Sequence, residues 1–419
     1  MKTYAEVLMI AIPMFIGLLF IEYLVSRYRK MEVINSFDTI SSLSSGITNT
    51  IKDVLGLAVI ILSYDWMVNH VAIFDIKSSV LAYVLAFIGI DFAGYWTHRF
   101  EHEINLLWNR HIIHHSSEEF NLACALRQNV SAIFGIFFFL FLPMAIIGVP
   151  AEVVAVVAPI HLFAQFWYHT RLINKMGFLE YIIVTPSHHR VHHAINDKYL
   201  DKNYGQIFII WDKMFGTFQE ELDEEKAVFG VKRQVNTWNP LLINFQHLLL
   251  LIKDAFYTKR LGDKLRVFYM PTGWRPKDRE ENDPVEYIKD PKTQVKYFTT
   301  ASTAMHIWLW IQLITTLLLM LFMFSRIDQV DFEYILLYGL FLTAGIFAYT
   351  SLMDRSNWSY LAESIKLIVG GVILWQLGTW FDLELLIPFG TAIIISYLIF
   401  SFFFNIYFMK KEPLLHSIN

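Results

Sequence analysis

The chain has almost no cysteine and comparatively little charge. Its 419 residues include one cysteine, Cys124, which excludes an intramolecular disulfide and a thiolate cluster for a metal. The simplest interpretation of Cys124 is a small buried residue. Only 17% of the residues are charged and the net charge is -4, so there is no basic surface of the kind that nucleic acid requires. Any metal site must therefore use nitrogen and oxygen ligands.

Long apolar stretches fill much of the chain, which is 55% hydrophobic and 16% aromatic. A bilayer crossing needs about 20 apolar residues, and backbone in lipid must satisfy its own hydrogen bonds. We therefore predict an all-α, polytopic membrane protein with about nine transmembrane helices. The predicted spans are residues 4–25, 51–68, 80–96, 131–149, 153–167, 305–324, 334–349, 365–380 and 385–403.

Basic residues next to the first and last spans predict the orientation. They are Arg27, Arg29, Lys30, Lys410 and Lys411, and such residues favour the cytoplasmic side. Nine spans then place the N-terminus outside and residues 98–128 and 171–300 in a cytoplasmic, histidine-rich helical cap. The first span is long and lacks a small-residue cleavage site, so we expect an anchor and not a removable signal peptide. Bacterial plasma membrane and endoplasmic reticulum both remain open.

Composition predicts three parts of the chain. Residues 1–260 carry most histidines and form a membrane domain with the cap, whereas residues 261–300, with four prolines among charged residues, are expected to be a cytoplasmic linker. Residues 301–419 form a C-terminal membrane domain of four helices. That domain contains only His306 and His416 and no chemical motif, so its function is not predicted.

Histidines in three clusters are the main chemical signal. Within each cluster the spacing is three or four residues, which places side chains on one helix face. Imidazole suits iron and zinc, and eight rings supply four nitrogens to each of two ions with coordination positions left open. The predicted ligands are His98, His102, His111, His114, His115, His189, His192 and His193. His169 is a ninth candidate, and the role of His188 is left open.

A metal is the physical reason to keep so many rings together, because crowded imidazolium ions would repel one another. Isolated histidines have a simpler explanation as polar tips that reach water at the membrane interface. This interpretation is applied to His70, His161, His247, His306 and His416.

Two other classes of function are considered. Residues 98–102 match H-x-x-E-H, in which two histidines hold one zinc and Glu101 acts as general base; a zinc hydrolase of this kind would leave the other two clusters without a purpose. A metal-binding sensor or carrier without turnover is the third class, but its spans would be expected to carry paired interior carboxylates.

The ordered series H-x-x-x-H, H-x-x-H-H and H-x-x-H-H around apolar spans resembles the fatty acid hydroxylase/sterol desaturase superfamily of membrane di-iron enzymes. The strings that carry the resemblance cover about residues 35–225, and within the superfamily they are most similar to the alkylglycerol monooxygenase branch. They are DFAGYWTHRFEHEINLLWNRHIIHHSSEEFNLACALRQ (91–128), QFWYHT (165–170), TPSHHRVHHAIN (185–196) and NYGQIFIIWDKMFGTFQEE (203–221).

The resemblance implies roles for these residues. The eight predicted ligands fall on the superfamily's iron positions, and Glu103 falls on an acidic position required for activity. The implied reaction is hydroxylation of the carbon next to an ether oxygen, followed by collapse to a fatty aldehyde and a glycerol derivative. Lipid, O2 and an electron donor are the implied partners, with tetrahydrobiopterin as the donor in this branch. Hydroxylation or desaturation of a sterol or fatty acyl chain is the alternative within the superfamily.

Several further residues are candidates with weaker signals. Asp91 lies inside a span, where an ionisable group is either functional, through a ligand imidazole, or a hydrogen-bond acceptor for a neighbouring helix. Glu101 is left open, and Glu118 is expected to be a solvated charge. Arg99, Arg127 and Arg190 lie beside the clusters and are candidates for a phosphate headgroup. Trp211, Asp212 and Gly216 are expected in a lid or, more simply, a turn.

Overall fold

The computed structural model describes residues 2–57, 59, 61–132 and 134–412, with only the backbone of residues 2–4. In this part of the chain the structure is helical, with four isolated β-bridges and no β-strand, which confirms the predicted all-α class. The longer helices are α1 (Lys2–Tyr28), α2 (Ser36–Val54), α3 (Tyr64–Val71), α4 (Val80–Glu103), α8 (Ala151–Phe163), α11 (Pro240–Tyr257), α12 (Leu261–Tyr269), α14 (Thr303–Arg326), α15 (Phe332–Met353), α16 (Trp358–Leu377) and α17 (Gly390–Lys411). The shorter α-helices are α5 (Asn105–Trp108), α6 (Ile112–His115), α7 (Leu142–Ile147), α9 (Pro186–His192), α10 (Ile210–Phe215) and α13 (Lys277–Asn282). The 3-10 helices are η1 (Cys124–Leu126), η2 (Ile136–Phe141), η3 (Gly177–Tyr181), η4 (Pro291–Thr293) and η5 (Leu383–Leu385).

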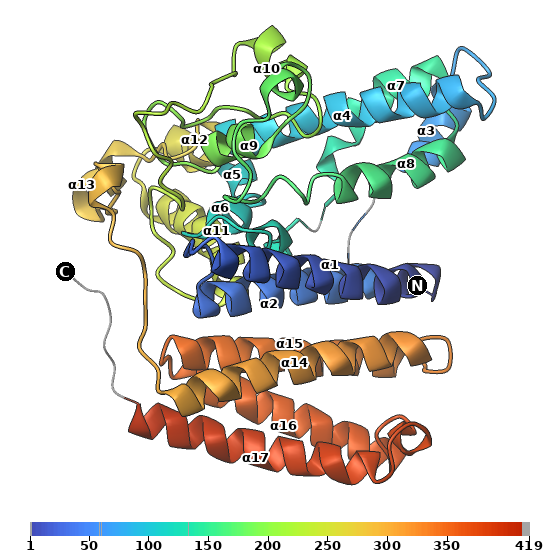
Figure 1. The fold of residues 1–419 in the computed structure, drawn as a ribbon, viewed down its shortest axis with the longest axis vertical. Coiled ribbons are helices and arrows are strands. Elements are labelled where there is room, and N and C mark those ends of the chain that lie inside the picture. Colours follow the sequence, from blue (N-terminus) through green and yellow to red (C-terminus); the bar gives the residue numbers. More distant parts are fainter. Residues whose placement is uncertain (1, 58, 60, 133, 413–419) are drawn as a thin grey trace.

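The long helices run side by side in layers (Figure 1). Helices α14–α17 pack on one another at one side, α1 and α2 lie between, and α4 with α3, α7 and α8 forms the other side. The short helices α5, α6, α9 and α10 gather at one end of the long helices, together with α11–α13. This end carries the histidine clusters, so the chain has a polar cap on a helical bundle.

Within the described residues, six helices are long and apolar enough to cross a membrane. They are α1 from Ala5 onward, α4, α14, α15, α16 and α17, and each corresponds to one predicted span. The other three predicted spans, residues 51–68, 131–149 and 153–167, are not such helices, so the count of nine is not confirmed. Part of the first two lies outside the described residues, at positions 58, 60 and 133.

The apolar residues 136–163 form a short hairpin, η2–α7 and α8, against α4. The 13 residues of α8 reach about 20 Å at 1.5 Å per residue, less than the ~30 Å hydrocarbon core. Gly148, with φ +87°, ends α7 in a left-handed conformation, and an added Cβ there would lie 1.9 Å from the carbonyl oxygen of Phe74. One face of these stretches packs on α4 while apolar side chains such as Ile160 and Leu162 stay exposed, a pattern that composition alone does not distinguish from a full crossing of the bilayer.

Helix α2 is the element that the hydropathy pattern missed. It is rich in Ser and Thr, yet it is largely buried among α14, α15, α11 and η1. Its hydroxyls find partners inside the protein: Ser44 donates to the carbonyl of Ile40 at 2.6 Å, and Ser41 donates to the carbonyl of Trp238 at 2.7 Å. Asn35 caps its start by accepting from two backbone N–H groups. Helix α2 can therefore be buried without being apolar, because its hydroxyl groups form hydrogen bonds inside the protein.

The largest apolar core joins both ends of the chain. It contains Phe37 and Ile40 of α2, Trp238, and residues from all four C-terminal helices. The segment 261–300, expected to be a linker, includes α12 and α13. The division of the chain at residues 260 and 300 stays a prediction.

Candidate metal centre

The end of α4 carries the first pair of histidines. His98 and His102 are one turn apart and both are buried. The Nδ1 atom of His98 donates to the carbonyl of Tyr204 at 2.8 Å, and that of His102 lies 3.5 Å from Asp201 Oδ1. With Nδ1 occupied on the outer side, the Nε2 atoms of both rings point toward the second cluster.

The second cluster lies at α6, with His111 just before the helix and His114 and His115 as its last residues. His111 Nε2 is 3.0 Å from His98 Nε2. His111 Nδ1 lies 3.5 Å from Glu101 Oε2, and Glu101 also accepts from Arg110 Nε at 2.9 Å. Glu101, whose role the sequence left open, therefore orients His111 through the Nδ1 atom, on the side of the ring away from the other histidines.

The third cluster lies on and just after α9, whose first turn Thr185 caps together with Pro186 at its start. His189, His192 and His193 are buried. His192 Nδ1 donates to the carbonyl of Lys202 at 2.9 Å. The helix thus presents these rings to the other two clusters.

Nine histidines form two groups. In each group, one ring nitrogen per residue lies within 4.8 Å of the corresponding nitrogens of all other members. The first group is His98, His102, His111, His115 and His192, and the second is His114, His169, His189 and His193. Every one of the eight predicted ligands belongs to a group. The structure adds His169 to the second, where its Nε2 is 2.8 Å from His189 Nε2.

The two groups are adjacent. The rings of His115 and His193, one from each group, stack with centroids 4.3 Å apart, and those of His111 and His114 are 5.1 Å apart. Two ions held by these groups would be near neighbours.

The donor set fits two cations better than it fits a network of hydrogen bonds. Facing Nε2 atoms can bond only when one carries a proton and the other does not, and the Nδ1 protons of His98, His169 and His192 are already committed to carbonyl oxygens. His192 Nε2 is buried without any hydrogen-bond partner. Unprotonated Nε2 atoms with occupied Nδ1 atoms are the arrangement of metal-binding imidazoles. Iron and zinc are the ions that this ligand set suits.

Burial keeps these rings neutral. Desolvation, followed by repulsion from neighbouring histidines, lowers the pKa of His115, His189 and His193 well below 6.5. Desolvation also lowers the pKa of His169, to about 3. Neutral imidazole is the form that binds a metal.

Acidification is expected to destabilise the protein. A histidine whose pKa in the folded state lies far below its unfolded value stays neutral in the folded protein but is protonated in the unfolded chain. Protonation therefore favours unfolding, and stability falls as the pH drops below about 6.5. Each such ring lowers the free energy of unfolding by about 1.4 kcal/mol for every pH unit of acidification in this range. Unfolding followed between about pH 7 and pH 5 should show a steep loss. An unchanged unfolding temperature would contradict the burial of these rings.

His188 lies outside both groups. Its Nδ1 accepts from the backbone N–H of Thr185 at 3.4 Å as part of the α9 cap. Desolvation lowers its pKa to about 4. The position of His188 in the chain, four residues before His192, is therefore explained by its role in capping α9.

Asp91 contacts none of the nine histidines. It accepts from His161 Nε2 at 2.8 Å, from Trp211 Nε1 at 2.8 Å, and from the backbone N–H groups of Ile207 and Phe208 at 2.8 and 3.1 Å. Of the two interpretations, the hydrogen-bond acceptor is the one this geometry supports. Asp91 fastens the 203–208 segment, and so the carbonyl of Tyr204, to α4.

The prediction for isolated histidines was wrong at two positions. His161 and His247 are buried and hydrogen-bonded, the latter by donating to the carbonyl of Asn105 at 2.9 Å, because helix packing covers them. His70 is exposed and His306 partly exposed, as expected, and His416 lies outside the described residues.

The candidate headgroup arginines are engaged in ion pairs. Arg99 contacts Glu103 at 2.9 Å, and Arg190 makes a two-pronged pair with Glu221. Glu103 is exposed beside α4 and contacts no histidine of either group, so its catalytic role stays a prediction.

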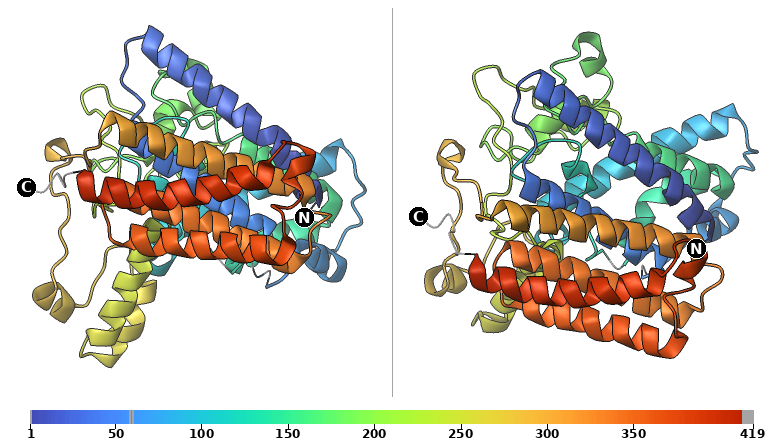
Figure 2. Two further views of the ribbon diagram at one scale, coloured as in Figure 1. Left: turned by 90° about the horizontal axis from the view of Figure 1, so that it is seen from below. Right: turned by 60° about the horizontal axis from the view of Figure 1, so that its bottom comes forward.

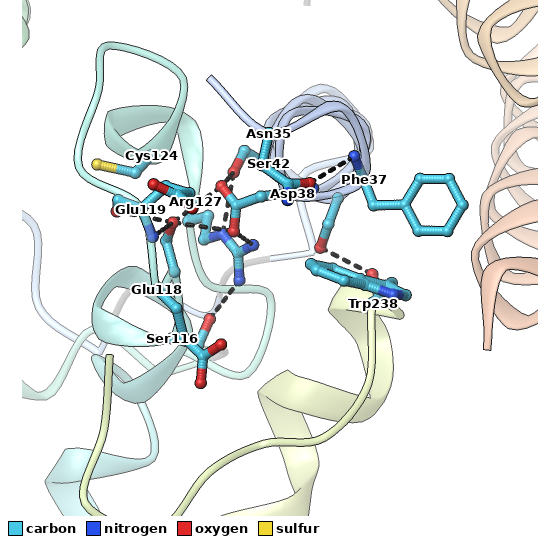
Figure 3. Close-up of polar contacts among 12 residues, drawn as sticks. Asn35, Phe37, Asp38, Ser42, Ser116, Glu118, Glu119, Cys124, Arg127 and Trp238 are labelled. Atoms are coloured by element: carbon cyan, nitrogen blue, oxygen red, sulfur yellow. Dashed lines mark hydrogen bonds and ion pairs between the residues drawn. The ribbon is translucent and has the colours of Figure 1, made fainter. Parts of the chain in front are cut away.

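Arg127 is buried in a network that holds the loop after α6 (Figure 3). It pairs with Asp38 Oδ1 at 2.7 Å and donates to Ser42 and Ser116 at 3.0 and 2.6 Å. Since Ser116 directly follows His115, the network anchors the second cluster to α2.

Glu118 was expected in solvent, but this was wrong. It is partly buried and accepts from the backbone N–H of Tyr297 at 2.6 Å and from Gln234 at 2.8 Å, because the 230–300 segment returns over it. The WDKMFG segment forms a turn, where Asp212 accepts from two backbone N–H groups and Gly216 has φ +75°.

A cavity of about 300 Å³ adjoins the histidines on the cap side. His102, His115 and His192 of the first group line it, together with apolar side chains such as Ile112 and Leu250. The cavity therefore gives a molecule with both polar and apolar parts access to the first group.

The zinc hydrolase alternative is not favoured by this geometry. His98 and His102 lie in the first group with three further histidines, whereas Glu101 is paired with Arg110. A single zinc would use only part of one group.

Comparison with known proteins agrees with the site. Residues 83–217 match the family model described as fatty acid hydroxylase. The human alkylglycerol monooxygenase is 38% identical over 268 residues, 64% of this chain and 59% of that protein. The Caenorhabditis elegans alkylglycerol monooxygenase is 28% identical over 365 residues, 83% of this chain and 66% of that protein. An ornithine lipid hydroxylase of Rhizobium tropici is 28% identical over 153 residues, 36% of this chain and 46% of that protein.

The resemblance inferred from the histidine series is thus confirmed at the level of the superfamily and of its alkylglycerol monooxygenase branch. The chain spans less than two thirds of the length of the human relative that it matches. No solved structure matches it.

Proposed function

We propose that this protein, whose residues 83–217 form a fatty acid hydroxylase domain, is an O2-dependent di-iron monooxygenase of membrane lipids. The observation that carries the proposal is the pair of adjacent groups of buried, neutral histidines. By similarity to the alkylglycerol monooxygenases, the substrate proposed is an alkylglycerol-type ether lipid.

The nine grouped histidines are the proposed ligands, five for one iron and four for the other. When bound, an iron pair supplies the ability to activate O2 and oxidise an unactivated C–H bond, which zinc does not. The protein's own part is to hold the imidazoles neutral and oriented. Tyr204, Lys202 and Gln165 do this through their carbonyl groups, and Glu101 does it through its carboxylate.

The reaction proposed adds one oxygen atom of O2 to the carbon beside the ether oxygen. Two electrons and two protons reduce the other oxygen atom to water. The resulting hemiacetal loses its C–O bond and gives a fatty aldehyde and a free glycerol hydroxyl. Hydroxylation of a fatty acyl or sterol carbon would use the same site and stop at the alcohol.

An amphiphile suits the position of the cavity. It lies in the cap beside the first histidine group, and its lining combines histidines and charged side chains such as Lys232 with aliphatic side chains such as Leu250. A polar headgroup can lie there while the alkyl chain stays among apolar side chains.

The cap is proposed to face the cytoplasm. The basic residues after α1 and at the end of α17 all lie at the histidine end of the long helices, and such residues favour the cytoplasmic side. This placement does not depend on the number of spans.

The electron donor is proposed to be a reduced pterin, on similarity alone. The test is metal analysis of the full-length protein in nanodiscs, followed by mass spectrometry of ether lipids after aerobic incubation with and without tetrahydrobiopterin. Two irons per chain and reductant-dependent aldehyde are expected. A single zinc, or no product from any ether, acyl or sterol lipid, would overturn the proposal.

A further inference from the structure

Helices α11 and α12 form a hairpin that leaves the bundle sideways. In the left view of Figure 2 this yellow-green pair projects across the direction of the long helices, near their histidine end. Its inner face packs on α5 and α6, next to the histidine groups. His247 donates to the carbonyl of Asn105, the N–H of Leu248 donates to Asn109 at 2.9 Å, and Leu250 lines the cavity.

The outer face of the hairpin is apolar and exposed. Phe256 is 74% and Leu261 80% exposed, so the described chain leaves most of their apolar surface uncovered. Spacing of three or four residues places them in one stripe on each helix. The stripe consists of Leu249, Ile252 and Phe256 on α11 and of Leu261, Leu265 and Tyr269 on α12.

The exposed charges of the hairpin are positive. Lys253, Lys259 and Arg260 are exposed, whereas its two acidic residues, Asp254 and Asp263, are buried. Asp254 is neutralised by Arg275 at 2.6 Å. Apolar side chains beside positive charge, on a helix pair that lies across the spans, are typical of elements in the headgroup layer of a membrane.

We infer that the α11–α12 hairpin lies in the headgroup layer of the bilayer that the long helices cross, with its apolar stripe in lipid and its basic residues on anionic phosphates. The apolar surface of the long helices requires lipid beside the bundle, and the hairpin projects across the direction of these helices near their histidine end (Figure 2). Because Leu250 lies on the same helix as Leu249 and Ile252 of the stripe, the hairpin also places one wall of the cavity close to the lipid boundary. The inference does not depend on the reaction proposed above.

The test uses a fluorescent probe on full-length, metal-loaded protein in nanodiscs. Cys124 is fully buried, so Phe256→Cys provides one reactive thiol, and Asp223→Cys, whose side chain is 97% exposed in the cap, provides the matched control. A quencher attached to lipid should quench the probe at position 256 several-fold more than the probe at position 223, and acrylamide in water should show the reverse. Equal access of acrylamide to both probes would overturn the inference. So would protection of position 256 from both quenchers, which would indicate a protein partner or a second copy of this chain.

The charge is tested by replacing Lys259 and Arg260 together with glutamine. In the unmodified protein, lipid quenching at position 256 should increase when phosphatidylglycerol is added to phosphatidylcholine nanodiscs, and the double variant should lose this increase. Lys277→Gln, an exposed lysine on α13, should keep it. An unchanged response of the double variant would contradict the role of anionic lipid. Both readouts are independent of turnover, so failure of the proposed reaction leaves them interpretable.

Discussion

Replacing His192 by alanine is expected to lower turnover by more than about 100-fold, because even outer partners of metal ligands contribute 10–100-fold. His192 Nε2 is buried without a partner among four other imidazoles, while its Nδ1 is held by the carbonyl of Lys202. Iron content should fall from two ions per chain toward one. Metal analysis and product formation on the same preparation are the measurements.

Two further variants sharpen this test. His169→Ala removes a member of the second group that the histidine series alone did not assign, so it should lose iron and turnover in the same way. The control is His70→Ala, an exposed histidine outside both groups that stacks on the ring of Trp66 and contacts the carbonyl of that residue. Full activity and two irons in His192→Ala or His169→Ala would show that these rings are not ligands.

Replacing Asp91 by alanine is expected to destabilise the protein by about 3–5 kcal/mol, the usual result of removing one partner from a buried charged network. His161, Trp211 and two backbone N–H groups would lose their acceptor inside a helix bundle. Because Asp91 also fastens the 203–208 segment, iron should bind more weakly to His98. Unfolding in detergent and iron retention during dialysis measure the two effects.

Glu103→Gln is the matched control on the same helix. The side chain of Glu103 is exposed and forms an ion pair with Arg99, and exposed pairs contribute about 0–1 kcal/mol. Its unfolding temperature should therefore stay close to that of the unmodified protein. A loss of turnover in this stable variant would support the catalytic role that the resemblance implies. If Asp91→Ala unfolded at the same temperature as Glu103→Gln, the structural role of Asp91 would be rejected.

The six long spans could be predicted because their signal is local. An apolar stretch such as α14 or α17 must cross the membrane as a helix whatever its neighbours are. The same reasoning is not confirmed for residues 131–167, where the apolar helices are shorter and contact α4. Hydropathy did not predict α2, which is polar in composition but buried. Its Ser44 donates to a carbonyl of the same helix, and its Ser41 donates to a carbonyl about 200 residues away in the chain.

The candidate ligands could also be predicted, since spacing of three or four residues is a local property of a helix. Their division between two ions could not. His192 joins His98 and His102 of α4, whereas its neighbours His189 and His193 join His114 and His169. Adjacent residues in the chain point to different ions because successive positions on a helix lie about 100° apart.

The sequence alone determined that this is a helical membrane protein with an imidazole site free of thiolate, because composition and helical spacing are properties of short segments and do not depend on how the chain folds. Only the tertiary structure decided which rings belong to one group, that His169 is among them, that Asp91 and Arg127 fasten the surrounding segments, and that α11 and α12 expose an apolar stripe. These features depend on contacts between residues far apart in the chain, and such contacts follow from how complete helices pack on one another.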